Sequence, residues 1–262
     1  MQSSLSDTIW LSDKRKRLLL LLMEGPRNID QIKTSLNVTS KSMMPQIKRL
    51  KDQNLIVNNK EDGGYRLSAI GTITVRNMMP LLRTLGVFEE NNEYWASRDL
   101  TPIPEELAYR LGELGECMII EPDVNHLFEL PIEFIGNLKR SDHVRSIISY
   151  FHPLYPPLYS ELSLRGTDLE LILTRSVLER MKEDCYNDLQ TMMDSENTKI
   201  YICDDEMKLT ITLTERFIYI CFFNKDGRYD HKTVMSFDES ALQWGSELID
   251  NYMNISELLD DL

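Results

Sequence analysis

A run of hydroxyl and ammonium groups opens one amphipathic segment of the sequence. Residues 39–42 read Thr-Ser-Lys-Ser, and Met43, Ile47 and Leu50 follow with the spacing of one buried helix face. The free N–H groups and the positive dipole end at a helix start suit phosphates and base edges. We therefore expect nucleic-acid contacts from this run and from the face opposite the apolar one: Thr39, Ser40, Lys41, Ser42, Met44 and Lys48.

A proline, Pro45, interrupts the same segment. It lacks an N–H group, so the carbonyl of Lys41 loses its helical partner, and a proline in mid-helix costs about 3 kcal/mol. With Thr39 as the cap, Pro45 lies at the sixth helical position, where a kink or a loosened first turn is expected. Two interpretations stay open: a tolerated shape feature, or a bend that angles the turn carrying Lys41 into a DNA groove.

A second group of polar side chains lies in "SYFHPLYPPLYSEL", residues 149–162, at the end of a predicted strand. Aromatic faces with hydrogen-bonding tips suit a small-molecule pocket, and ligands of α/β proteins bind in loops that follow strands. The alternatives are a proline-stiffened turn whose tyrosines cover the core edge and, for the two arginines, salt bridges with acidic residues. The candidate effector-binding residues are Tyr150, His152, Tyr155, Tyr159, Arg145 and Arg175.

Catalytic and metal-binding signatures are absent from the sequence. It contains no P-loop, GxGxxG, GxSxG or HExxH motif, and its four histidines lack ligand spacing. The four cysteines are scattered without a CxxC pair, which favours reduced thiols over zinc. We therefore expect no enzyme activity, no metal and no cofactor.

The net charge of −13 is unevenly distributed along the chain. Residues 1–70 hold 12 Lys and Arg against 7 Asp and Glu, a net charge of +5, and the remainder has a net charge of −18. Duplex DNA attracts basic surfaces and repels acidic ones. A basic head on an acidic body therefore suggests that only the head meets phosphates.

Three helices and a hairpin are predicted within the basic head. Helices begin at the caps Ser12, Asn28 and Thr39, and short strands at 55–59 and 65–68 flank a glycine-containing turn. This order is that of a winged helix-turn-helix, in which the third helix enters the major groove and the wing touches the backbone. The alternative is a helical bundle with a decorative hairpin.

Further basic residues surround this motif. Lys60 and Arg66 are the cations of the wing and are expected DNA contacts, although Glu61 and Asp62 weaken the wing tip as a phosphate clamp. Residues 14–17, Lys-Arg-Lys-Arg, are interpreted as a solvated face or as a further backbone contact.

The stretch "IDQIKTSLNVTSKSMMPQIKRLKDQNLIVNNKEDGGYRLSAIG" resembles the DNA-binding domain of the ArsR-type winged-helix regulators of archaea, over residues 12–71. A helix predicted at 71–86 carries apolar residues at 75, 78, 79, 82 and 85. In the regulators that the chain resembles, this position commonly holds a dimerisation or linker helix, so the resemblance implies a homodimer reading two half-sites. The alternative is that this helix packs on its own body. Residues 87–107 are predicted to form an irregular connector.

The acidic body alternates apolar strand-like runs with helical stretches, which predicts an α/β domain. The runs start near 117, 144, 169, 199, 208 and 217, helices are expected near 103–114, 127–138, 154–164 and 176–188, and a hairpin turning at 226–227 precedes a helix capped by Asp238.

Two stretches of the body, "FHPLYPPLYSELSLRGTDLELILTRSVLERM" and "DGRYDHKTVMSFDESALQWGSELIDNYM", resemble the C-terminal domain of methanogen-type archaeal transcriptional regulators. That resemblance implies a sensor domain. A more distant resemblance, to archaeal sugar-responsive regulators, implies a phospholipase-D-like architecture. The HxK pair that phospholipase-D chemistry needs is missing, so binding rather than catalysis is expected.

The sequence therefore predicts a cytoplasmic, homodimeric transcriptional regulator without a membrane segment, whose partners are double-stranded DNA and an unidentified effector. The predicted domains are an α+β winged helix-turn-helix at 1–70, a linker or dimerisation helix with its connector at 71–100, and an α/β sensor at 101–262. A protein-interaction scaffold and a hydrolase with an unrecognised site are the alternatives.

Overall fold

The computed structural model describes residues 4–59, 63–126, 129–204 and 207–261, and Lys60 lies outside these ranges. The chain divides into two compact units, Met1–Leu82 and Arg83–Leu262. They are called unit 1 and unit 2.

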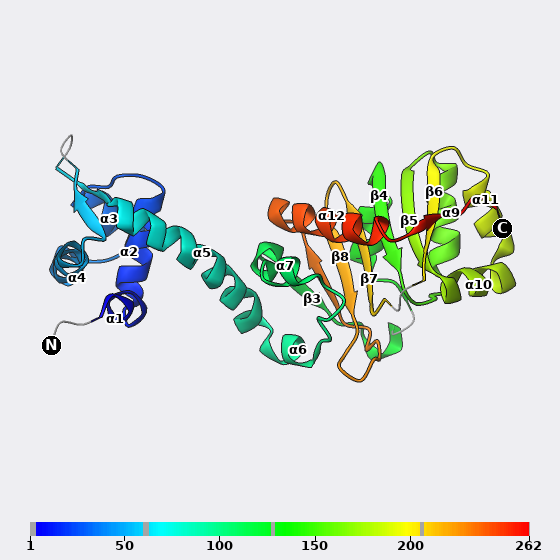
Figure 1. Ribbon diagram of the computed structural model, residues 1–262, viewed down its shortest axis with the longest axis horizontal. Helices are drawn as coiled ribbons and strands as arrows, with labels where there is room; N and C mark the ends of the chain where they lie inside the picture. The colour runs from blue at the N-terminus through cyan, green and yellow to red at the C-terminus, as the bar shows by residue number, and fades with distance from the viewer. Residues whose placement is uncertain (1–3, 60–62, 127–128, 205–206, 262) are drawn as a thin grey trace. The chain divides into compact units, whose positions relative to one another are not determined.

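Unit 1 contains the three predicted helices, the predicted hairpin and one short helix that was not predicted (Figure 1). The two strands pair antiparallel, with Ile56 opposite Leu67. Its elements are α1 (Leu5–Trp10), α2 (Asp13–Met23), α3 (Ile29–Leu36), α4 (Ser40–Asp52), β1 (Ile56–Asn58) and β2 (Tyr65–Leu67). The helix α5 (Ala69–Glu90) begins in unit 1 and ends in unit 2.

The helix starts of unit 1 follow their capping residues. Asn28 forms a reciprocal capping box with Gln31, and the Thr39 hydroxyl accepts the N–H of Ser42 at 3.3 Å. Ser12 occupies the cap position of α2 without a side-chain bond, so that predicted cap bond is absent. Pro45 lies within α4, which runs from Ser40 to Asp52 as one helix.

The first part of α5, up to Leu82, packs its apolar face on unit 1. Val75 and Met78 are buried in the core formed by α2, α3 and α4, and Met79 and Leu82 pack against that core. Four of the five apolar positions predicted on this helix are thus used within the unit. The fifth predicted position, Leu85, is exposed, as are Ile70, Ile73 and Leu81 outside the predicted set.

Unit 2 is an α/β structure. Its helices after α5 are α6 (Asn92–Ser97), α7 (Glu105–Ala108), η1 (Leu111–Leu114), η2 (Val124–His126), α8 (Ile132–Leu138), α9 (Tyr155–Leu164), α10 (Arg175–Asp184), α11 (Tyr186–Met193) and α12 (Glu239–Met253). Its strands are β3 (Met118–Ile120), β4 (His143–Ile148), β5 (Asp168–Thr174), β6 (Thr198–Cys203), β7 (Leu209–Thr214), β8 (Ile218–Phe222), β9 (Thr233–Ser236) and β10 (Glu257–Leu258).

Among the described residues of unit 2, the strands form one sheet in the order β10-β6-β5-β4-β7-β8-β9-β3. β4, β5 and β6 are parallel, whereas β7 is antiparallel to β4 and begins the hairpins that end at β9. The chain moves from β4 to β6 in one direction and then returns to the other side of β4. The strand order therefore reverses at β4, the position where α/β proteins bind ligands.

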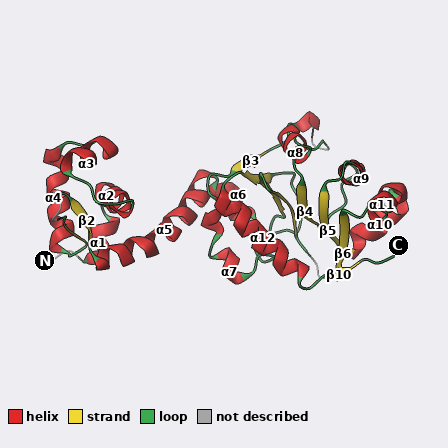
Figure 2. Cartoon of the chain, turned by 90° about the horizontal axis from the view of Figure 1, so that it is seen from above, coloured by secondary structure: helices red, strands yellow, loops and turns green. Residues whose placement is uncertain are grey.

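Alternating residues of the strands fill two cores, one on each face of the sheet. Ile172 of β5 packs with Trp244 and Leu248 of α12, whereas its neighbours Leu171 and Leu173 pack with α8 to α11. Figure 2 shows the sheet lying between α12 and the group of α9, α10 and α11. The period of two along each strand thus produces a three-layer arrangement.

Three predictions about unit 2 were wrong in detail. The connector at 87–107 contains the end of α5 and also α6, because Tyr94 and Trp95 are buried in the core. The helix expected at 176–188 divides at Cys185, whose non-helical φ of −138° separates α10 from α11. Asp238 occupies the predicted cap position of α12, but its side chain does not bond the helix start, because its Oδ2 accepts the N–H of Glu116 at 2.8 Å instead.

Candidate functional site

The outward face of α4 is a basic and apolar surface. Lys41, Met44 and Lys48 are exposed on it, whereas Met43 and Ile47 on the opposite face are buried. Among the described residues, neither lysine takes part in a salt bridge. Both ammonium groups are therefore available to an external anion.

The start of α4 is more constrained than its lysines. The Thr39 hydroxyl accepts from the Ser42 N–H, and the Ser42 hydroxyl donates to the Thr39 carbonyl at 3.0 Å. Ser40 is half-buried in the first turn. The capping contacts fix the backbone of this turn, and with it the direction of Lys41.

The wing is tied to the end of α4. Lys51 Nζ donates to Asn58 Oδ1 at 3.0 Å, which joins the last turn of the helix to β1. Arg66 is exposed on β2, and its guanidinium donates weakly to the Leu67 carbonyl at 3.5 Å. Arg66 is therefore placed on the solvent side of the hairpin.

The basic run at residues 14–17 of α2 was interpreted as a solvated face or as a DNA backbone contact, and Arg15 fits neither interpretation. Arg15 is only 5% exposed and hydrogen-bonds within unit 1, so it is neither solvated nor free for a phosphate. Lys14 and Arg17 are exposed, and Lys16 lies 4.0 Å from Asp13.

In unit 2, the predicted aromatic residues gather at the carboxyl end of β4. The Ser149 N–H donates to Thr210 Oγ1 at 3.0 Å, which fixes the loop after β4 against β7. The hydroxyls of Tyr150 and Tyr155 lie 3.4 Å apart, and the His152 ring centroid lies 5.1 Å from that of Tyr155. The strand reversal at β4 thus coincides with three of the six predicted residues.

A fourth predicted residue, Tyr159, lies deeper. It is 1% exposed, and its hydroxyl is 2.8 Å from Ser146 Oγ and 3.2 Å from Thr212 Oγ1. These contacts satisfy the phenol inside the core. Tyr159 therefore supports the base of the aromatic group.

The two predicted arginines lie apart from the aromatic residues. Arg145 points to α12, where it meets Asp250 at 2.6 Å, and it also meets Glu170 at 2.7 Å. Arg175 pairs with Asp204 at 2.8 Å. The structure thus contains the salt bridges that were the alternative interpretation for both residues.

The aromatic group has two further members that were not predicted from the sequence. Tyr229 stacks on Tyr150 with centroids 4.7 Å apart, and His231 lies 5.0 Å from Tyr229. His231 also has a left-handed φ of 62°, which is uncommon for a residue with a Cβ. The Tyr-x-His spacing in "RYDHK" repeats that of "YFH" at 150–152, but only the fold brings the two segments together.

Burial sets the protonation of this group. Burial and the nearby His231 lower the pKa of His152, and its Nδ1 accepts the Leu154 N–H at 3.2 Å, so the neutral ring carries its proton on Nε2. Because the folded pKa is below the unfolded one, this residue's contribution to stability is lost as pH falls through that pKa. Burial also raises the pKa of the central Cys221 thiol to about 12, which makes it unreactive.

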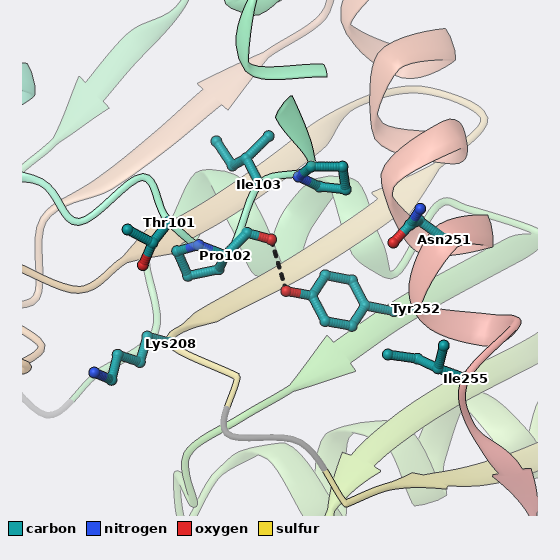
Figure 3. A pocket seen from close by; sticks show the side chains of 8 residues that line it. Thr101, Pro102, Ile103, Lys208, Asn251, Tyr252 and Ile255 are labelled. Atoms are coloured by element: carbon teal, nitrogen blue, oxygen red, sulfur yellow. Dashed lines mark hydrogen bonds between the residues drawn. The ribbon is translucent and has the colours of Figure 1, made fainter. Parts of the chain in front are cut away.

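The cavities of unit 2 are small at the aromatic group and larger elsewhere. The space lined by Tyr150, His152, Tyr229 and His231 measures about 20 Å³, enough for one water molecule. A shallow pocket of about 580 Å³ lies between residues 101–104 and the end of α12 (Figure 3). In it, the Tyr252 hydroxyl donates to the Pro102 carbonyl at 2.7 Å.

Within the described ranges, no cluster of His, Cys, Asp or Glu has a geometry that would hold a metal ion. The helices in those ranges are all too short or too polar to cross a membrane.

Two family models match this chain. Residues 8–86 match the N-terminal domain of the methanogenesis regulatory protein FilR1, and residues 127–255 match its middle domain. The FilR1 protein of Methanothrix harundinacea (strain 6Ac) is 23% identical over 255 residues, 95% of this chain and 57% of that protein. The chain thus spans little more than half the length of this relative.

Solved structures are more distant. The archaeal chromatin protein TrmBL2 matches over 94% of both chains with 12% identity and a TM-score of 0.43. NucT from Helicobacter pylori matches 55% of this chain and 99% of its own, with 10% identity and a TM-score of 0.42. Both TM-scores are low.

Proposed function

Because the chain belongs to the family of the FilR1 methanogenesis regulatory proteins, we propose that it is a transcriptional regulator that binds duplex DNA through α4 and the wing. The observation that carries this proposal is the outward face of α4, where Lys41 and Lys48 flank Met44 without an intramolecular ion pair among the described residues. Lysines supply phosphate contacts, and an exposed apolar side chain between them suits a base edge. Thr39, Ser40, Ser42 and Arg66 complete the proposed surface.

Fluorescence anisotropy of the full chain on a labelled duplex from upstream of its own gene tests this proposal. Affinity should fall steeply as salt rises, and a scrambled duplex should bind at least about 10³-fold more weakly. Lys48→Ala should reduce the slope of log K against log salt by about one. The control, Lys199→Ala, removes an exposed charge from β6 and should leave the slope unchanged. Salt-independent binding, or equal slopes for both variants, would contradict the proposal.

We also propose that two copies associate through α5. The exposed side chains Ile70, Ile73 and Leu81 lie on one side of this helix, together with Asn77, and none of them is charged. Because this stripe carries no charge, two copies of it can pack together without electrostatic repulsion at the contact, although the chain has a net charge of −13. Two recognition helices in a symmetric dimer would then read two half-sites.

The aromatic group at β4 is the proposed effector site. Tyr150, His152 and Tyr155 supply stacking faces and polar tips at the strand reversal, and Tyr159 supports them from the core. Since the space there holds about one water, an effector would bind a more open arrangement and shift the population toward it. Tyr150→Leu should abolish the response of operator affinity to the small-molecule fraction of a cell extract. An unchanged response would remove this group from the proposal.

A further inference from the structure

Arg15 joins the shortest helix of unit 1 to α4. Its guanidinium Nη1 donates to Gln46 Oε1 at 2.7 Å, Nε donates to the Thr8 carbonyl, and Nη2 lies 3.4 Å from the Asp7 carbonyl. The two carbonyls belong to α1 and the amide belongs to α4. One buried side chain therefore bridges two elements that are more than thirty residues apart.

The bridge reaches α4 where that helix is weakest. Pro45 provides no N–H to the Lys41 carbonyl, so one rung of the helical ladder is missing directly beside Gln46. The first turns, which carry Lys41 and Met44, are therefore held to the rest of α4 by fewer internal bonds. An external contact at Gln46 stabilises the direction of these turns.

Arg15 is not placed to contact a phosphate of DNA. Its side chain is buried, its donors are used inside unit 1, and burial together with the nearby Arg49 lowers its pKa. A guanidinium stays protonated under these conditions, and it interacts favourably with the carbonyl end of α1. The charge of Arg15 thus stabilises the fold of unit 1 and does not contact the DNA backbone.

We propose that Arg15 is a positioning residue for DNA recognition, which holds α4 through Gln46 so that the turns around Pro45 present Lys41 and Met44 in one orientation. This inference rests on the proposed DNA-binding function. It predicts a loss of discrimination between sequences without a loss of electrostatic attraction. If Arg15 instead contacted a phosphate directly, its loss would weaken the electrostatic attraction and leave the discrimination between sequences unchanged.

The test measures the ratio of affinities for the native and the scrambled duplex, together with the salt slope. Arg15→Lys keeps the charge but loses the planar fork, and Gln46→Ala removes the acceptor and leaves both α1 carbonyls bonded. Each should lower the ratio by roughly tenfold, the size of one lost charge-assisted hydrogen bond, with the salt slope and the affinity for the scrambled duplex unchanged. The double variant should be no worse than Arg15→Lys alone, because both changes break the bond between Arg15 and Gln46. Arg17→Lys, on the exposed side of α2, is the control.

Three results would overturn the inference: an unchanged ratio in Arg15→Lys and Gln46→Ala, a salt slope reduced by about one in Arg15→Lys, or additive losses in the double variant. If Arg15→Lys unfolds unit 1, Gln46→Ala alone decides, since it leaves Arg15 in place. A wild-type protein that fails to discriminate the two duplexes would refute the proposed function itself. A discriminating wild type with equally discriminating variants would refute only the role of Arg15.

Discussion

Asp230→Ala should destabilise unit 2 by about 3 kcal/mol, because it leaves a buried guanidinium without its counter-charge. The Arg98 side chain is 2% exposed, and it donates through Nη1 to Asp230 Oδ1 at 2.8 Å and through Nη2 to Oδ2. It also donates to the carbonyls of Phe222 and Tyr94, at 3.2 and 3.3 Å. The carbonyl contacts remain in the variant, but they carry no formal negative charge.

The magnitude follows from the burial of the pair. Removing one partner of a buried ion pair costs about 3–5 kcal/mol, and the lower end applies here because Asp230 keeps 30% of its surface exposed. Burial by itself would raise the pKa of Asp230, but the hydrogen bonds and charge of Arg98 outweigh it and lower that pKa below 3.8. The contribution of Asp230 to stability is therefore present above pH 3.8 and is lost as pH falls through its folded pKa.

Urea unfolding in a Trp10→Phe background measures this effect, since the remaining tryptophans, Trp95 and Trp244, both lie in unit 2. The free energy of unfolding should differ from the wild type by about 3 kcal/mol at neutral pH, and the difference should shrink below pH 3.8. Asp226→Ala removes an exposed carboxylate from the same β8–β9 connection and should change it by less than about 0.5 kcal/mol. A loss below about 1 kcal/mol, or one that does not depend on pH, would refute the reasoning.

Two further predictions concern α5. A Cβ added at Gly71 would lie 1.9 Å from the Leu55 carbonyl oxygen, so Gly71→Ala should reduce the free energy of unfolding of unit 1 by about 3 kcal/mol, which calorimetry detects as a lower melting temperature. Gly86→Ala, farther along the same helix where nothing lies within 4 Å of the added Cβ, should be neutral or stabilising. Equal effects of the two substitutions would contradict the steric argument. Ile73→Glu should convert a dimer to a monomer in analytical ultracentrifugation, whereas Arg76→Glu, off the stripe, should not; a dimer that survives Ile73→Glu does not use this face.

The local elements of unit 1 were predictable because their signals are local. Asn28 with Gln31 and Thr39 with Ser42 are pairs three residues apart, so the sequence alone contains both partners of each cap. The helix α1 was missed because it has only six residues and depends on a contact with Arg15, which lies beyond its end. A helix that short is unstable without tertiary contacts.

The orientation of α5 shows that hydrophobic periodicity alone does not determine which face of a helix is buried. Its apolar residues repeat on two sides, and the sequence assigned the set containing Val75 and Met78 to an external partner or to its own body. The close approach of Gly71 to Leu55 brings the helix onto unit 1 and buries that set, which leaves Ile73 outside. A glycine that allows backbone contact is visible in a sequence, but the backbone that it meets is not.

The candidate effector site was half predictable. Tyr150, His152 and Tyr155 lie within six residues of one another, so their proximity follows from the chain itself. Tyr229 and His231 reach the same place only through the antiparallel pairing of β8 and β9 beside β7, a non-local property of the sheet. The sequence pattern predicted an aromatic group with polar tips, and the topology adds Tyr229 and His231 to it, whereas its binding of an effector stays a prediction.

The charge distribution links the two units to the proposed function. In the described part of unit 2, two half-buried or buried arginines are held by acids: Arg98 by Asp230, Arg145 by Glu170 and Asp250. Such paired cations contribute little field beyond their own contacts, so the excess of acidic residues dominates the surface of this unit. The lysines of α4 have no such partners among the described residues. Under the proposed function, an acidic unit 2 with neutralised cations would be repelled by DNA, and this repulsion would confine binding to the face of α4 that we propose Arg15 holds in place.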